Sequence, residues 1–500
     1  MSGTPAGGGD GTGVCIVGTA RRIWRGLDAA PEPLTMWEEV VRAAAADVGT
    51  ARDVVGDLDH LAVVHCLSWE YDDPGGRLAA RLGRPEMPTS ASILAGTSPQ
   101  RLIDKVAALM VRGECSAAVV VGAEAAATLG RYEAAGETVP WSFPSAARPS
   151  VLETLDTWYL PTERRHGVLP AWLTFALLEQ ARWAKRGASA EDRRVLGERM
   201  AGLSRVAART DDAWFRVERT PEELLAGGPD NRLVVTPYSK AMTAFPAVDM
   251  AAANVVVTTA VADAWGVPEE WRVHLRGSGF ARDASHVAGR TDLAGSAGMR
   301  AATTEALRRA GVTVDRLDGF DLYSCFGAAI AFAADALGLA DDDPRPITFT
   351  GGLPYYGGPG SNYMSHSISH VVDAIRAGRA GNVMVTGVGM HMTKHVAAVW
   401  SADPGPLTTG PIEEQHNVLG DDPVEVADEA TGPCTVEAAA AVYARSGAPE
   451  RAVAICGLED GRRCYAVSED VDVVAAVADG GWVDTPATVR SAAGINALEL

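Results

Sequence analysis

The sequence predicts an α/β fold built from two copies of one unit. Short segments recur in the same order at a long, nearly constant spacing, and in each copy strand-like runs alternate with helical patterns. Apolar residues make up 47% of the 500 residues and charged residues 22%, which is ordinary globular composition and excludes wholesale disorder. At this length we expect roughly three domains.

The internal repeat is carried by four pairs of segments with matching order and element type. The pairs are 14–18 with 273–277 and 63–67 with 322–326 at an offset of 259, and 110–113 with 375–378 and 119–122 with 384–387 at an offset of 265. The offset is constant except for one change, from 259 to 265. A duplicated α/β unit with one loop insertion would produce this pattern.

Each copy shows the same alternation. In the first, apolar residues at helical spacing follow Ser98-Pro99, with Ser98 as the expected N-cap and Pro99 at the first helical position, and Gly113 ends the helix before an apolar strand at 117–121. The second copy has a helical pattern over 364–375 and a strand at 383–385. Strands alternating with helices predict a mainly parallel, buried sheet in each unit.

The remaining segments have their own character. Residues 171–206 show helical patterning within a segment rich in Trp, Arg and Glu, and after a Pro/Gly/Asp-rich stretch the last residues favour strands at 435–443, 452–458 and 464–467, with a hairpin turn at Asp460-Gly461. We therefore expect an N-terminal half at 14–131, a helical insertion at 132–245, the end of the first half at 246–268, a C-terminal half at 269–401, a linker at 402–433 and a small β domain at 434–500.

Charge and cysteine usage narrow the function classes. The net charge of −20 repels nucleic acids and anionic membranes, and no uninterrupted apolar run is long enough to span a bilayer. Residues 1–13 form a Gly-rich segment that predicts a flexible tail rather than a signal peptide. Seven scattered cysteines without CxxC spacing favour a reducing cytoplasm over a disulfide framework or a zinc site.

Several phrases carry a resemblance to a known family. They are 95–100 (AGTSPQ), 248–253 (VDMAAA), 321–326 (DLYSCF), 351–354 (GGLP) and 357–360 (GGPG). With the duplicated unit and the insertion, the chain resembles the thiolase superfamily over roughly 14–400, specifically the thiolase-like proteins often labelled acetyl-CoA acetyltransferase. The resemblance implies a layered αβαβα arrangement of two βαβαβ-type halves, and the tail resembles the additional, oligonucleotide-binding-like β domain of such proteins.

The same resemblance shows what this chain lacks. The nucleophilic Cys of a working thiolase falls on Gly96, the His of its Gly-His-Pro turn falls on Gly358, and its acid/base Cys maps near Gly387-Val388-Gly389. The fourth catalytic motif is represented by 323–326 (YSCF), which keeps only Cys325. Ordinary thiolase activity is therefore not expected.

Other side chains are candidates for the missing chemistry. Cys325 follows a predicted strand and faces the expected cleft, where a thiolate could be acylated, although a Cys in that position is also typical of a small core residue. His366, just after the glycine loop, is the leading acid/base candidate. The pairs His366/His370 and His391/His395 have spacing that can chelate zinc on a helix, but nothing like an HExxH motif accompanies them, so we predict no metal.

The expected ligand is an acyl thioester. Gly96, Thr97, Ser98, Tyr323, Gly357 and Gly358 are the predicted substrate-binding residues, because glycine loops let backbone N–H groups approach a carbonyl closely. The same glycines are equally typical of tight turns that pack two halves together. Trp158, Arg164, Arg165 and His166 of the insertion could contact a CoA phosphate or form a solvated charged face.

Two function classes follow from these residues. In one, the chain is a divergent acyltransferase in lipid metabolism that acts on acyl-CoA or an acyl-carrier thioester, with Cys325 and His366 as catalytic groups and no resident cofactor. In the other, it is a catalytically silent acyl-CoA-binding or scaffolding protein. The tail, with five Arg and no Lys against ten Asp and Glu, is predicted to be a lid or docking module for a protein partner rather than a nucleic-acid binder. A homodimer is the other partner that the sequence leaves open.

Overall fold

In the computed structural model, residues 12–26, 30–146, 158–408 and 422–499 are described. The predicted Gly-rich tail lies almost entirely outside these residues, as does much of the predicted linker. One nine-stranded sheet contains both copies of the repeated unit, in the order β3-β2-β4-β7-β1-β8-β11-β10-β9. The first copy supplies β1 (Val14–Ile23), β2 (His60–Val63), β3 (Thr89–Ala91), β4 (Ala117–Ala125) and β7 (Asp249–Thr258). The second supplies β8 (Val273–Arg282), β9 (Gly319–Asp321), β10 (Asn382–Gly389) and β11 (Lys394–Ser401).

The strand order confirms the duplication. Read from the outside inward, β2-β4-β7-β1 in the first copy corresponds to β9-β10-β11-β8 in the second, and the two copies meet where β1 pairs antiparallel with β8. The parallel pairs are β2 with β3, β2 with β4, and β9 with β10, while β7 and β11 run antiparallel to their neighbours. The sheet is therefore mixed rather than mainly parallel.

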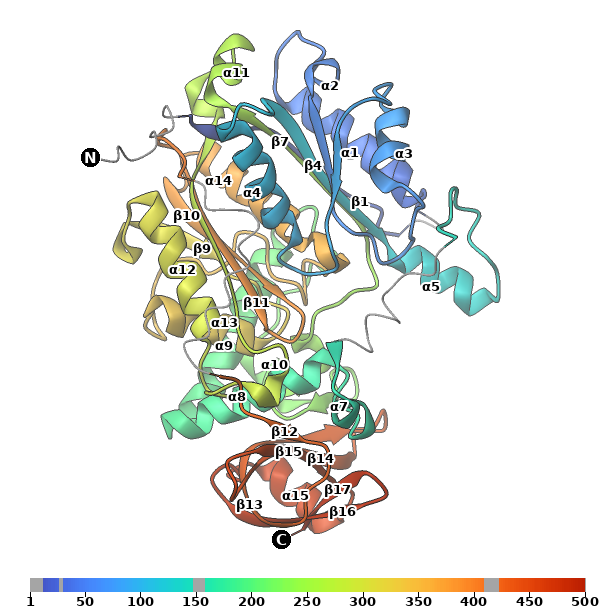
Figure 1. Cartoon of the computed structure of the whole chain (residues 1–500), viewed down its shortest axis with the longest axis vertical. Coiled ribbons are helices and arrows are strands. Elements are labelled where there is room, and N and C mark those ends of the chain that lie inside the picture. The colour runs from blue at the N-terminus through green and yellow to red at the C-terminus, as the bar shows by residue number, and fades with distance from the viewer. Residues whose placement is uncertain (1–11, 27–29, 147–157, 409–421, 500) are drawn as a thin grey trace, which may run out of the picture.

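Helices complete a layered arrangement (Figure 1). Helices α4 (Ser98–Val111) and α14 (Tyr363–Arg376) form the central layer, because each contacts strands of both copies. Helices α1 (Pro33–Asp47) and α3 (Pro74–Arg81) cover the outer face of the first copy, and α12 (Ala297–Ala310) with α13 (Gly327–Leu337) covers that of the second. Short helices α2 (Val54–Asp57), α5 (Ala126–Ala135) and α11 (Thr259–Ala264) follow strands of the first copy or connect them.

The insertion is helical, but its predicted long helix is divided in two. Helix α8 (Ala171–Arg186) ends at Gly187, which adopts a left-handed φ of 64°, and α9 (Ser189–Ala208) follows. Helices α7 (Pro161–Arg165) and α10 (Pro221–Ala226) flank this pair. Strands β5 (Leu233–Val235) and β6 (Tyr238–Ser239) then leave the insertion and join the sheet of the C-terminal domain through Val235 and Val442.

The C-terminal domain is a closed five-stranded barrel. Its strands are β13 (Gly432–Tyr443), β14 (Pro449–Leu458), β15 (Arg463–Ser468), β16 (Pro486–Ala492) and β17 (Ile495–Glu499), with β12 (Val426–Ala427) beside β15. Pairing runs β13-β14-β15-β17-β16 and back to β13, and helix α15 (Val471–Asp479) lies between the third and fourth strands. The barrel therefore has the five-stranded oligonucleotide-binding type of architecture that the sequence predicts.

The barrel is fastened to the rest of the molecule by its packing. Ala438, Ala440, Val453, Ile455 and Tyr465 belong to the same hydrophobic core cluster as the central helices. The Tyr465 hydroxyl donates to Glu163 in α7 at 2.8 Å, and Arg463 donates to the carbonyl of Ala288 at 2.9 Å. The barrel is thus an integral part of the fold, at the lower end of the view in Figure 1.

Candidate functional site

Four loops converge where the thiolase resemblance places its chemistry. They precede α4 (residues 92–97), follow β9 (322–326), precede α14 (350–362) and connect β10 with β11 (390–393). Hydrogen bonds join the first three to one another and to β10: Ala95 N donates to Ser361 Oγ at 3.1 Å, Leu353 N to Ser324 Oγ at 3.3 Å, and Tyr323 N to Thr386 Oγ1 in β10 at 2.9 Å. The predicted phrases of both copies therefore meet at one place.

Gly96 is held as glycine by Tyr323. A Cβ atom at position 96 would overlap the Tyr323 hydroxyl and the carbonyl oxygen of Val388. The position that a nucleophilic Cys would take is therefore filled by a phenol from the second copy. The Tyr323 ring packs edge-to-face on Tyr363, with centroids 5.6 Å apart. Burial raises the pKa of Tyr323 well above its ordinary value, so the hydroxyl is protonated at neutral pH.

Cys325 lies two residues further on, within the core. Its side chain is 8% exposed, its carbonyl accepts a hydrogen bond from Ala244 N at 2.9 Å, and burial raises the pKa of its thiol. A thiol that stays protonated is a poor nucleophile, since the thiolate is the reactive form. No hydrogen bond joins Cys325 to His366 among the described residues, and a catalytic role for either stays a prediction.

His366 belongs to a buried hydrogen-bond network with Tyr356 and Asp212. Tyr356 donates its hydroxyl hydrogen to Asp212 Oδ2 at 2.9 Å, so His366 Nδ1–H donates to the Tyr356 oxygen, also at 2.9 Å. His366 is 0% exposed, and burial lowers its pKa to about 3. Its Nε2 atom has no hydrogen-bond partner in the described structure. The imidazole is therefore neutral, with an unpaired nitrogen.

Arg21 supplies the positive charge next to the hydrogen bonds of His366, Tyr356 and Asp212. Its guanidinium binds Asp212 at 2.9 Å and Asp373 at 2.6 Å, and His370 Nε2 lies 3.3 Å from the other oxygen of Asp212. Sequence reasoning missed Arg21, Asp212 and Tyr356. Tyr356 stands directly before Gly357, which is a positional hint, but nothing in the local pattern links it to a carboxylate 144 positions away.

The glycine loop is used mainly for packing. Gly358 N donates to Phe245 O at 2.9 Å, and Gly360 N donates to Gly358 O at 2.7 Å, so these N–H groups are already occupied. Gly357 has a φ of 117°, and a Cβ there would lie 2.8 Å from Met250 Sδ. The geometry favours the tight-turn interpretation at these positions over a set of free donors for a ligand.

Thr97, and not Ser98, is the N-cap of helix α4. Helix α4 begins at Ser98, so Thr97 is the N-cap and Pro99 is the second helical residue. The prediction of Ser98 as N-cap was wrong because its hydroxyl donates to Ile93 O at 2.7 Å instead. The Thr97 side chain makes no capping hydrogen bond, and both residues line a surface pocket.

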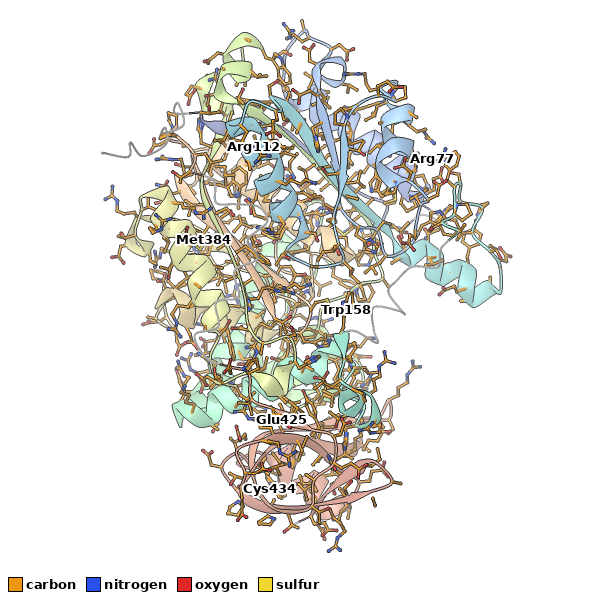
Figure 2. All side chains as sticks on the ribbon, viewed as in Figure 1. Arg77, Arg112, Trp158, Met384, Glu425 and Cys434 are labelled. Carbon is orange, nitrogen blue, oxygen red and sulfur yellow. The ribbon has the colours of Figure 1, made fainter. Side chains whose placement is uncertain are left out.

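The cationic residues of the insertion contact the barrel. Arg165 donates to Gly494 O at 3.0 Å and pairs with Asp428 at 3.3 Å, while buried His166 accepts from Asn496 N at 2.8 Å. His166 is buried, so neither the CoA-phosphate nor the solvated-face interpretation fits it. Arg165 is exposed even though it contacts the barrel, so both interpretations stay predictions for Arg165. Trp158, labelled in Figure 2, is the first described residue of the longer described stretch of the insertion, 158–245.

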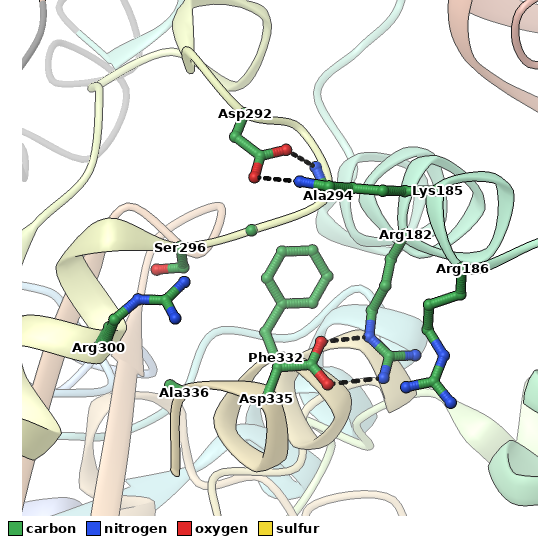
Figure 3. A pocket seen from close by; sticks show the side chains of 11 residues that line it. Arg182, Lys185, Arg186, Asp292, Ala294, Ser296, Arg300, Phe332, Asp335 and Ala336 are labelled. Atoms are coloured by element: carbon green, nitrogen blue, oxygen red, sulfur yellow. Dashed lines mark hydrogen bonds and ion pairs between the residues drawn. The ribbon is translucent and has the colours of Figure 1, made fainter. Parts of the chain in front are cut away.

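A pocket of about 270 Å³ between α8, α12 and α13 contains none of the predicted site residues (Figure 3). Its cations are largely paired with carboxylates: Arg182 binds Asp335 at 2.6 Å, and Lys185 binds Asp292 at 2.8 Å. Within the described ranges, no group of His, Cys, Asp and Glu side chains could hold a metal ion, and no helix is long and apolar enough to cross a membrane.

Comparisons with known proteins place this architecture. No protein-family model matches the chain, and no curated protein does. Among solved structures, the monomeric SCP2-thiolase-like protein type 1 (STLP1) from Mycobacterium smegmatis is similar to it, with a TM-score of 0.83 and 28% identity over 97% of this chain and 98% of that one. The chain is thiolase-like in its fold.

A second solved structure shares the fold with this thiolase-like protein. The Ltp2-ChsH2(DUF35) aldolase aligns with a TM-score of 0.59 and 16% identity, over 78% of this chain and 98% of that one. The thiolase-like architecture with its additional C-terminal β domain thus agrees with the expectation from the sequence.

Proposed function

We propose that this thiolase-like protein binds an acyl thioester, as acyl-CoA or on an acyl carrier, and holds it without forming an acyl-enzyme. The thiolase-like fold and the loops that meet beside Gly96 support the ligand class. The absence of a covalent step distinguishes the proposal from ordinary thiolase chemistry.

The observation that carries the proposal is the contact between Gly96 and Tyr323. Covalent thiolase chemistry needs a thiolate at the beginning of the central helix, where the helix N-terminus lowers its pKa. Here a protonated phenol fills that space, and no side chain can be added at position 96 without overlapping it. A bound thioester would meet a neutral hydrogen-bond donor in place of a nucleophile.

Acyl transfer through Cys325, with His366 as acid/base, is the alternative. Burial of the Cys325 thiol and the hydrogen bond that occupies His366 Nδ1 both weigh against it. A shift of Cys325 toward a more exposed position on ligand binding would be required before its thiolate could form in quantity.

Intact-mass measurement with parallel calorimetry separates the two. We expect saturable acetyl-CoA or longer acyl-CoA binding, no acyl adduct, and the same affinity in Cys325→Ala. Cys115→Ala, which removes a buried thiol that contacts Asp59 just before β4, is the matched control. An adduct that forms in the native chain and in Cys115→Ala but is lost in Cys325→Ala would establish acyl transfer instead.

Location and partners complete the proposal. All seven cysteines are free and buried, which supports the cytoplasmic location that we propose. For the partner, the paired name of the Ltp2-ChsH2(DUF35) aldolase supports a protein that docks on this chain, and a second copy is the other candidate. Light scattering on the purified chain tests the second copy directly, because a homodimer has twice the 52.2 kDa of the monomer.

A further inference from the structure

A basic pocket lies beside the candidate site, on the surface where α4 begins. It has a volume of about 230 Å³ and is built by both copies of the repeated unit. The first copy contributes the segment after β3 and the first two turns of α4, and the second contributes the end of β8 and the first residue of β11. We refer to it as the α4 pocket.

The lining of the α4 pocket is cationic, although Arg101 lies 3.9 Å from the carboxylate of Asp104, which is outside the lining. Arg101 and Lys105 come from α4, Arg282 from β8 and Lys394 from β11, and no Asp or Glu is among the lining residues. The cluster of positive charge contrasts with the whole protein, whose net charge is −20. Like charges that share a small, partly desolvated space repel one another, and an anion placed among them removes that repulsion.

Lys394 is the central cation of the α4 pocket. It is half-buried, and both burial and the nearby Arg282 guanidinium lower the pKa of its ammonium group. Neither Lys394 nor Lys105 has an ion pair or side-chain hydrogen bond within the described residues. The pocket of Figure 3 differs in this respect, since there Lys185 and Arg182 each have a carboxylate partner.

The neutral part of the lining adds a donor and an apolar wall. Thr97 is 2% exposed, lines the pocket and leaves its hydroxyl without a capping bond at the beginning of α4. Opposite it, Phe280 stacks under the Arg101 guanidinium at 4.2 Å, and Ile93 is 64% exposed. A ligand that fits has a multiply charged anionic end and a short apolar portion.

We propose that the α4 pocket binds a phosphate-bearing small molecule, with its phosphate between Lys394, Lys105 and Thr97 and its apolar portion against Ile93 and Phe280. Phosphate suits this lining because two ammonium groups and a hydroxyl match its charge and its several acceptor oxygens. Thr97 and Ser98 are also predicted substrate-binding residues, but Gly96 and Tyr323, whose contact carries the function proposed above, do not line the α4 pocket, so the two proposals can fail separately.

Calorimetric titration of the full chain with pyrophosphate, at low and at physiological ionic strength, tests the proposal. We expect saturable 1:1 binding that weakens at least about tenfold in Lys394→Met. It should be retained in Lys394→Arg, which keeps the charge. Lys185→Met, which removes a cation from the pocket of Figure 3, is the matched control and should bind as the native chain does.

Lys105→Met gives an independent measurement if Lys394→Met fails to fold, as judged by its thermal unfolding. No saturable binding by the native chain, or equal weakening in the Lys394 and Lys185 variants, would overturn the proposal in favour of diffuse attraction to surface charge. Competition with CoA then identifies the source of the phosphate. Displacement of pyrophosphate assigns the pocket to the phosphates of CoA, and coexistence assigns it to a separate phosphate ester.

Discussion

The two copies of the repeated unit have the same scaffold. In each, the first strand carries a glycine that lets the outer helix approach at backbone distance. A Cβ at Gly18 in β1 would overlap the carbonyl of Ala44 in α1, and one at Gly277 in β8 would lie 2.5 Å from the carbonyl of Ala306 in α12. Gly18 and Gly277 are separated by the repeat offset of 259. Strand order and helix packing are therefore duplicated down to single residues.

The central helices of the two copies differ in what they bury. Helix α4 buries mainly apolar residues along one side, whereas α14 is buried on nearly all sides and carries Ser365, His366, Ser367 and Ser369 inside the protein. Several of its buried polar atoms, among them His366 Nε2 and Ser367 Oγ, have no hydrogen-bond partner in the described structure. Since unpaired buried polar groups destabilise a fold, the polar side chains of α14 oppose part of the stability that its burial provides.

Equivalent positions on the first strands of the two copies also carry different residues. Substituting them one at a time should give the largest difference in the free energy of unfolding. Arg21 in β1 corresponds to Phe280 in β8. We expect Arg21→Met to destabilise the fold by about 3–5 kcal/mol, because Asp212 would lose its guanidinium partner inside the protein. Phe280→Met should cost about 1 kcal/mol. Chemical denaturation measures both, and equal losses would show that Arg21 is no more important than its counterpart.

The shared scaffold can be tested at its paired glycines. Gly18→Ala and Gly277→Ala should each destabilise the fold by about 3 kcal/mol, because the new methyl group meets helix backbone that cannot move independently. Gly130→Ala is the control: it lies in α5 with open space around it, and should be neutral or stabilising by up to about 1 kcal/mol. A large loss at only one of the two paired positions would contradict equivalent packing in the two copies.

The vacated nucleophile position gives a smaller effect of the same kind. Gly96→Cys should cost about 2 kcal/mol, since its Cβ overlaps the Tyr323 hydroxyl and the Val388 carbonyl. Adding Tyr323→Phe to Gly96→Cys should recover part of that loss by removing the hydroxyl. A Gly96→Cys variant as stable as the native chain would show that space for a thiol exists there after all, and would weaken the proposed function.

Much of this scaffold could be predicted from sequence because the repeat leaves a local record. The offsets of 259 and 265 make β1 equivalent to β8 and β4 equivalent to β10, and the strand order of the structure confirms both equivalences. The same pattern predicts where α4 and α14 end. Gly113 and Gly378, which follow the two helices, both have a left-handed φ. Local periodicity and turn residues are enough for elements of this kind.

The site was harder to predict because its contacts join distant residues. The loss of a Cys at position 96 was visible in the sequence, but not that Tyr323 fills the space, since that depends on the path of a loop from the other copy. The chain from Arg21 through Asp212 and Tyr356 to His366 likewise joins three separate regions. Side-chain packing between copies has no sequence period that would reveal it.

The asymmetry of the central helices should finally appear as a dependence of stability on pH. His366 has an ordinary pKa of 6.5 when unfolded and about 3 in the buried chain beside Asp212, Arg21 and His370. Between these values the unfolded state binds a proton that the folded state does not, so stability is complete above 6.5 and is lost as the pH falls toward 3. A single such group contributes a slope of up to about 1.4 kcal/mol per pH unit.

His366→Gln keeps a hydrogen-bond donor for Tyr356 but cannot titrate, so its stability should fall less steeply in acid than that of the native chain. Denaturant unfolding at pH steps from neutral to about pH 4 measures the slope. Ser367→Ala, a buried and non-titrating neighbour on α14, should keep the native slope. If both variants have the native slope, the proton is taken up elsewhere, for example at His370 or His395, whose pKa values burial also lowers. In that case the titration of His366 does not dominate the acid sensitivity of the fold.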